Sequence, residues 1–143
     1  MTIAQIQRFA KASISDLLVM ALRDSQVQDA ILELNTQAQL FDLGEDSEGI
    51  KLSAIGGSYS SVTLALHPEK SKDKITLRDT GKYYDSFKLT PESTGDFKIT
   101  SNPNKNGRSL FERWGDKVEG LNEGNYQKAL DIIEQKVLEI ILK

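Results

Sequence analysis

The sequence predicts an α+β fold, with helices at both ends of the chain and a small, mostly antiparallel β-sheet between them. Apolar residues recur every three to four positions in residues 1–43 and again in residues 108–143, as they do in amphipathic helices. In residues 50–100, short segments with apolar residues two apart alternate with turns rich in Gly, Pro and Ser. Helices that lie outside an antiparallel sheet define the α+β class.

The N-terminal part, residues 1–43, is predicted to form helices. One apolar stripe runs from Ile3 to Ala21, and a second runs from Val27 through Leu34 and Ala38 to Phe41. Asp24-Ser25 between them is typical of a helix cap, so we favour two helices with a bend, with one long helix as the alternative. Gly44 is expected to end the second stripe.

The middle part, residues 50–100, is predicted to be the sheet region. Four short strands are expected, at 61–67, 74–77, 87–90 and 97–100. The loop 91–96 contains Pro, Ser and Gly and should close a hairpin, and residues 101–107 form a second break rich in turn residues. Residues 45–61 have the composition of a surface connection.

The C-terminal part, residues 108–143, is predicted to return to helix. Ser109 with Glu112 three residues later is a capping-box pattern. Gly120 or Gly124 should interrupt the helix, after which a stripe from Tyr126 to Ile140 continues to the chain end. At 143 residues the chain is predicted to be a single domain with one core.

Composition argues against several kinds of site. The chain has no Cys and one His, His67, so a zinc site would need three carboxylates and a Ser-His-Asp triad would depend on His67 alone. The net charge of −3 does not predict a nucleic-acid-binding surface. We find neither a signal peptide nor a membrane span in the sequence. Asp46 and Glu48 match only a fragment of a calcium loop, and a solvated acidic turn is expected there. We predict no metal, cofactor or catalytic site.

The tripeptide Asp79-Thr80-Gly81 carries the catalytic carboxylate in aspartic proteases. Such enzymes need two carboxylates about 3 Å apart that share a proton. The cations Arg78 and Lys82 flank the tripeptide, would lower the pKa of Asp79, and so oppose that state. Ser109 stands where the second protease signature has Asn or Asp, and those enzymes are almost entirely β. We therefore predict that the chain is not a protease and not an enzyme.

The same residues fit a structural turn. Asp79 and Thr80 can bond nearby backbone N–H groups, Gly81 supplies an unrestricted φ, and Ser86 follows in the segment that leaves the turn. The aromatic residues of the chain have the composition of interface anchors. Those that we consider for an interface are Tyr59, Tyr83, Tyr84, Trp114 and Tyr126.

Several segments occur in a characteristic order: "LNTQAQLFDLGEDSEG", "GGSYSSVT", "ITLRDTGKYYDSFKL", "FKITSN" and "LFERWGDKVEGLN". This order resembles the phage virion-morphogenesis or tail-completion proteins of the head–tail junction, in particular versions from phages of Bacteroides-type hosts, including crAss-like podoviruses. Such proteins typically carry Leu-x-Asp-Thr-Gly followed by Ser, here Leu77 to Ser86. They also carry an aromatic residue with Gly and then Val-x-Gly-Leu, here Trp114-Gly115 and Val118 to Leu121. The resemblance covers about residues 31–143.

The resemblance implies a structural virion protein, assembled in the host cytoplasm, whose copies form a homo-oligomeric ring under the portal. Its implied partners are the portal or head–tail adaptor and tail proteins, with DNA passing through the lumen without sequence-specific binding and with no membrane. The helices at both ends would pack against neighbouring copies, and the loops 45–61 and 101–107 would reach adaptor or tail proteins. The alternative is a small protein-binding or regulatory module, which would stay a monomer or dimer.

Overall fold

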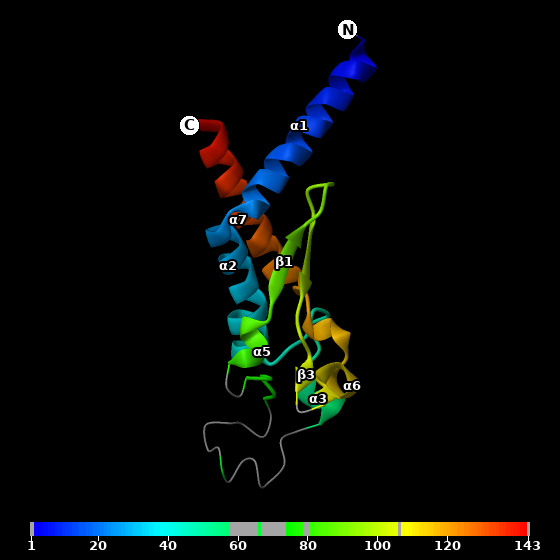
Figure 1. Ribbon diagram of the computed structural model, residues 1–143, viewed down its shortest axis with the longest axis vertical. Helices are drawn as coiled ribbons and strands as arrows, with labels where there is room; N and C mark the ends of the chain where they lie inside the picture. The colour runs from blue at the N-terminus through cyan, green and yellow to red at the C-terminus, as the bar shows by residue number, and fades with distance from the viewer. Residues whose placement is uncertain (1, 58–65, 67–73, 79–80, 106, 143) are drawn as a thin grey trace.

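The computed structural model has the α+β architecture that the sequence predicts, with helices at both ends and two small antiparallel sheets (Figure 1). It describes the chain except residues 1, 58–65, 67–73, 79–80, 106 and 143, and except the side chains at 6 and 8–13. The elongated body is formed around the helices α2 (Ser25–Glu33) and α7 (Glu123–Leu142). The long helix α1 (Ile3–Arg23) leaves this body at one end.

The first helix breaks at Asp24, as predicted. Thr2 caps α1 through a reciprocal capping box with Gln5, and Asp24 has an extended backbone with φ −67° and ψ 128°. The Asp24 carboxylate accepts a hydrogen bond of 3.0 Å from the N–H of Val27 and so begins α2. The interpretation as two helices is therefore correct.

A π-helix, η1 (Leu34–Leu43), continues α2 and ends at Gly44, which adopts the left-handed conformation expected of it, with φ 65°. The prediction for the buried face of this segment was wrong. The α-helical stripe placed Leu34, Ala38 and Phe41 in the core, but all three are only half-buried. The wider π turn instead rotates other positions inward, and the buried ones are Asn35, Thr36, Gln39 and Leu40.

The middle of the chain contains less sheet than predicted. Strands β1 (Lys88–Pro91) and β2 (Phe97–Thr100) pair antiparallel with Leu89 opposite Ile99, as expected for the hairpin. The strand predicted at 61–67 lies outside the described residues, apart from Leu66. Of the strand predicted at 74–77, the structure retains a single β-bridge position at Lys74; residues 75–77 form no strand, and Leu77 turns the chain with φ 61°. Short helices, α3 (Leu52–Gly56) and α5 (Lys82–Asp85), take part of this region instead.

The predicted break at 101–107 contains a second small hairpin, β3 (Asn104–Lys105) with β4 (Arg108–Ser109). Ser109 caps α6 (Leu110–Trp114), accepting from the N–H of Phe111 rather than from that of Glu112 as in the expected capping box. After the 3₁₀ turn η2 (Asp116–Val118), Gly120 interrupts the helical region with φ 103°, and Gly124 lies inside α7.

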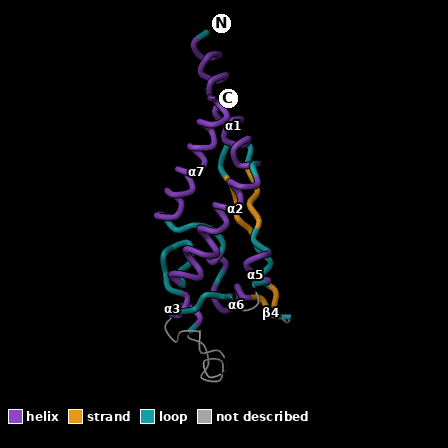
Figure 2. The backbone as a smooth tube through the Cα atoms, turned by 90° about the vertical axis from the view of Figure 1, so that its left-hand side faces the viewer, coloured by secondary structure: helices purple, strands orange, loops and turns teal. Residues whose placement is uncertain are grey.

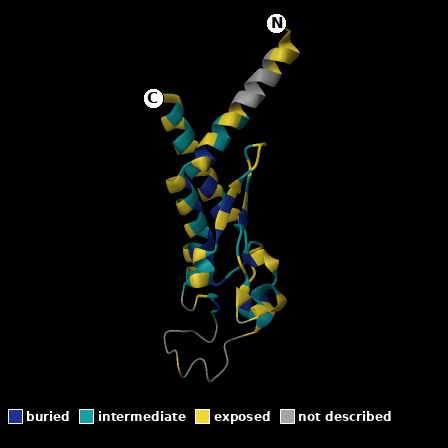
Figure 3. Ribbon diagram, in the orientation of Figure 1, coloured by how far each residue is buried: buried dark blue, intermediate teal, exposed yellow. Residues whose placement is uncertain are grey.

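One cluster of buried apolar side chains runs through the body, and all three parts of the chain contribute to it (Figure 3). Its fully buried centre includes Leu22, Ile31, Leu40, Leu52, Ile75 and Val118. Seen from the side, α7 and α2 lie on one side of the hairpin β1–β2 (Figure 2). The core therefore lies at the level of α2 and the first half of α7, and the outer half of α1 extends beyond it.

Candidate assembly surface and the polar clamp beneath it

The outer half of α1 extends away from the body and exposes apolar side chains (Figures 1 and 3). Ile3 is 75% exposed and Ile14 is 59% exposed. Both lie on the same face of the helix as Ala21, which is fully buried, because the steps of 11 and 7 residues are close to whole turns. At its two described outer positions, Ile3 and Ile14, the face that packs into the core at the base of α1 is therefore exposed.

Helix α7 has two apolar faces. One packs into the core through Ala129 and Ile133. The other is exposed and carries Leu130, Leu138 and Ile141, of which the last two are 48% and 56% exposed. The prediction placed Leu130 on the same stripe as Ile133, whereas the helix turns Leu130 toward the surface. A second apolar row on a helix that already packs on one side is typical of a contact with another chain.

The base of these two helices is fixed by an ion pair. Lys136 Nζ on α7 lies 3.2 Å from Asp24 Oδ2, at the junction between α1 and α2. The N–H of Val27 bonds to the same carboxylate and, together with Lys136, lowers the pKa of Asp24 below its ordinary value. The bond with Asp24 raises the pKa of Lys136. Both groups are thus charged at neutral pH, and the pair fixes the point from which α1 diverges.

A polar clamp holds the loop 118–122 against η1. Asn35 donates to the carbonyl of Val118 at 3.0 Å and accepts from the N–H of Gly120 at 2.7 Å. Gln39 donates to the carbonyl of Gly120 at 2.8 Å and accepts from the N–H of Asn122 at 2.8 Å. Two buried amide side chains, four residues apart on η1, therefore satisfy four backbone groups of this loop.

Asn125 completes the clamp from the first turn of α7. It is buried, and its side chain donates to Gln39 Oε1 at 3.3 Å and to the carbonyl of Leu34 at 3.4 Å. Its own N–H bonds to Asn122 Oδ1 at 2.9 Å, which begins α7. The start of α7 is thus fixed to η1 by hydrogen bonds between buried polar groups. These bonds can form only in one register of α7 against η1.

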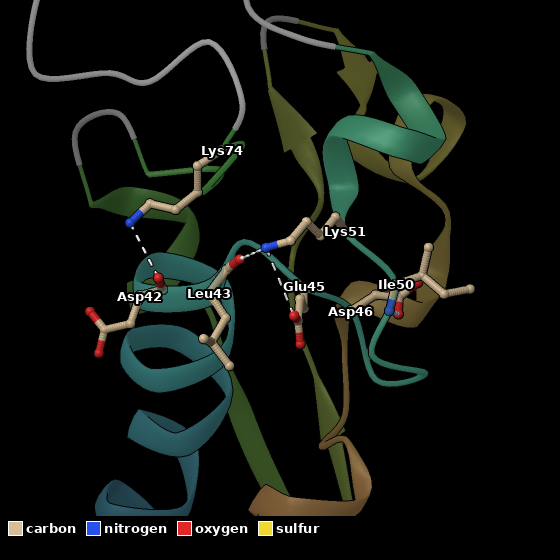
Figure 4. A network of polar contacts seen from close by, with 7 residues as sticks. All are labelled: Asp42, Leu43, Glu45, Asp46, Ile50, Lys51 and Lys74. Carbon is tan, nitrogen blue, oxygen red and sulfur yellow. Dashed lines mark hydrogen bonds and ion pairs between the residues drawn. The ribbon is translucent and has the colours of Figure 1, made fainter.

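The end of η1 is closed by lysine side chains and by an acidic turn (Figure 4). Lys74 donates to the carbonyl of Asp42 at 3.2 Å and Lys51 donates to that of Leu43 at 3.5 Å, so both bond to carbonyls that a helix end leaves free. Asp46 is buried, not solvated as predicted, because its carboxylate accepts from the N–H groups of Glu48 and Ile50. The turn lies at the surface as predicted, since Glu48, Gly49 and Ile50 are exposed, but Asp46 at its start is buried in an Asx turn.

The predicted structural turn lies partly outside the described residues, since Asp79 and Thr80 are not described. Gly81 has φ 90° and precedes α5, a conformation that favours glycine. Ser86 follows α5, and its hydroxyl accepts from the N–H of Asn102 at 3.0 Å, which attaches this segment to the end of β2.

Two of the tyrosines considered for an interface are half-buried and bond within the chain. The Tyr83 hydroxyl lies 3.0 Å from Ser101 Oγ, which in turn donates to Glu119 at 2.7 Å. Burial, reinforced by the charge of Glu119, raises the pKa of Tyr83 to about 12. The Tyr84 hydroxyl donates to the carbonyl of Thr76. These two tyrosines therefore connect α5 to the body.

The other aromatic candidates have different surroundings. Tyr59 lies outside the described residues. Trp114 is a core residue rather than a surface anchor, and the guanidinium of Arg113 stacks 4.5 Å from its ring. Tyr126 is half-buried against Phe97, with ring centroids 6.0 Å apart, and burial raises its pKa. Of this set, only Tyr126 lies on one of the two long end helices.

A pocket of about 690 Å³ lies between the turn 47–49 and the start of α7. Its charged lining side chains, Glu48, Glu123 and Lys128, have both signs, and Asn125 is already bonded within the clamp. The lining therefore favours neither an anion nor a cation.

In the described part of the chain, no group of three or more His, Cys, Asp or Glu residues could hold a metal ion. Among the same residues, every helix is too short or too polar to span a bilayer. Comparison with models of protein families, with curated proteins and with solved structures found no match to this chain.

Sequence reasoning missed the residues of the clamp. Asn35 and Gln39 interrupt the predicted apolar stripe of 27–41 as ordinary polar residues of a helix surface. The one hint of burial in the sequence is that the two amides are four residues apart and that each has a leucine as its neighbour, Leu34 before Asn35 and Leu40 after Gln39. Their partners lie more than 80 residues further along the chain, which no local pattern reveals.

Proposed function

We propose that this chain is a structural protein that assembles with copies of itself into a ring, and that the ring belongs to the head–tail junction of a phage particle. The observation that carries the proposal is the pair of exposed apolar rows on α1 and α7, at the end of the molecule where the two helices diverge. A monomer gains nothing from holding Ile3, Ile14, Leu138 and Ile141 in water, whereas an assembly buries them.

The setting in the virion rests on the ordered segments of residues 31–143 that resemble tail-completion proteins. In this proposal the portal or head–tail adaptor binds one side of the ring and tail proteins bind the other. The DNA would pass through the lumen without sequence-specific binding. The net charge of −3 supports this, because a chain with an excess of acidic residues has no net attraction for phosphate.

Native mass spectrometry of the purified full chain, combined with negative-stain electron microscopy, tests the proposal. We expect a single closed oligomer of more than two copies that appears as a ring and dissociates on dilution. A chain that remains a monomer or dimer at every concentration, and that shows no ring, would contradict the proposal and favour the small binding module.

A further inference from the structure

We propose that the outer half of α1 of one copy packs across the exposed row of α7 of the next copy. The inference rests on the proposed self-assembly and names the two surfaces that meet. The row of α7 is defined by Leu130, Leu138 and Ile141, and the row of α1 by Ile3 and Ile14. The contact is heterologous, since one face of a copy meets a different face of its neighbour.

The two rows match in length. Ile3 and Ile14 are 11 residues apart, and so are Leu130 and Ile141. At 1.5 Å of rise per residue, each row extends for about 16 Å along its helix. Two helices with apolar rows of equal length can bury both rows along a single line of contact, as ridges of one helix pack into grooves of the other.

The two stretches of sequence also have net charges of opposite sign. The stretch from Ile3 to Ile14 contains two basic residues, Arg8 and Lys11, and no acidic residue. On α7, Asp131, Glu134 and Glu139 are exposed, and Glu134 lies within the row, four residues from both Leu130 and Leu138. The one basic residue between Leu130 and Ile141 is Lys136, and its Nζ is already paired with Asp24 Oδ2 of its own chain at 3.2 Å. Complementary charge of this kind favours α7 of another copy as the surface that α1 meets.

The contact cannot form within one chain. Figure 1 shows α1 and α7 diverging from their common base, so the outer half of α1 points away from the α7 of the same molecule. The Asp24–Lys136 pair connects the two helices at this base. A helix that cannot fold back onto its own partner surface is available to the equivalent surface of a neighbour.

A mixing experiment distinguishes this arrangement from others. The first variant carries Ile3→Asp with Ile14→Asp, and the second carries Leu138→Asp with Ile141→Asp. Each variant alone should be a monomer, with the concentration for half-assembly raised by about tenfold or more. An equal mixture should form a heterodimer and nothing larger, because only the intact α1 of the second variant and the intact α7 of the first can meet.

The exposed Gln135 provides the control. It lies about 120° around the helix from Ile141, about 140° from Leu130 and about 60° from Leu138, at the edge of the row, and Gln135→Asp should assemble like the wild type. Formation of the heterodimer also shows that both variants are folded. If the wild type forms rings and either variant still does, this inference is wrong while the proposed function stands. Loss of assembly in both without a heterodimer on mixing also overturns it. A wild type that never assembles contradicts both proposals.

Discussion

Replacement of Gln39 by Leu should lower the free energy of unfolding, because Gln39 is the centre of the polar clamp. Leu has a similar volume and leaves no large cavity, so the change removes hydrogen bonds and little else. It leaves the carbonyl of Gly120 and the N–H of Asn122 without partners, and both had bonds of 2.8 Å. It also removes the longer bond from Asn125, of 3.3 Å.

The magnitude follows from the burial of these groups. A buried polar group that loses its partner costs about 1–3 kcal/mol, and the two backbone groups are only half-buried, so about 1 kcal/mol each is reasonable. With the weaker third bond, we expect the free energy of unfolding to fall by about 2–3 kcal/mol. For a chain of this size, that corresponds to a decrease in Tm of roughly 6–12 °C.

Urea unfolding followed by circular dichroism, at one fixed protein concentration, measures this loss. Gln37→Leu is the matched control on the same helix. Gln37 is exposed, and among the described residues its side chain bonds to Asp42, so its replacement should change the free energy of unfolding by less than about 0.5 kcal/mol. If Gln39→Leu also changes the free energy of unfolding by less than about 0.5 kcal/mol, with an unchanged m-value, the clamp does not hold the loop 118–122 and the reasoning fails.

Two further results are expected. Because the pKa of Tyr83 is raised to about 12 while an unfolded tyrosine titrates near 10, its contribution to stability is complete below pH 10 and is lost as the pH rises toward 12. Absorbance at 295 nm should show a late-titrating tyrosine that disappears in Tyr83→Phe, and a titration that is the same in both proteins would refute this. Gly56→Ala should destabilise the fold by about 1–3 kcal/mol in thermal unfolding, since its Cβ would lie 2.7 Å from Trp114 Cδ1. In Gly124→Ala the added Cβ would meet Asn122 Oδ1 at an ordinary contact distance of 3.8 Å, so this change within α7 should be neutral or stabilising. Equal effects at the two glycines would contradict the packing argument.

The elements that could be predicted from sequence are those that depend on near neighbours. The cap at Asp24 and the terminator at Gly44 act within a few residues, so they are visible in the sequence. The hairpin β1–β2 is equally local, because its strands are joined by a loop that contains Pro, Gly and Asp. Segment 74–77 has the same alternation of apolar residues, but alternation alone does not provide a neighbouring strand. There the chain turns at Leu77 instead.

The π-helix could not be predicted, because distant residues stabilise it. An α-helix over 34–43 would bury the apolar stripe and leave Asn35 and Gln39 near the surface. The π turn brings both amides inward, at the cost of burying polar groups, and the backbone of 118–122 offsets that cost with four hydrogen bonds. The predicted stripe on α7 placed Leu130 together with Ile133, whereas Leu130 is exposed. Periodicity places apolar residues on one face and does not indicate when a helix has two.

The clamp also explains, within a single chain, why the segment from Val118 to Leu121 needs its particular residues. Asn35 and Gln39 bond to backbone atoms of this loop. Its side chains have roles of their own: Val118 is fully buried, the Glu119 carboxylate accepts from Ser101, and Leu121 packs against the core. Gly120 has a φ of 103°, which favours glycine. The spacing that resembles tail-completion proteins at this point is thus accounted for by folding. The assembly proposal depends instead on α1 and α7, where apolar side chains remain exposed in the single chain.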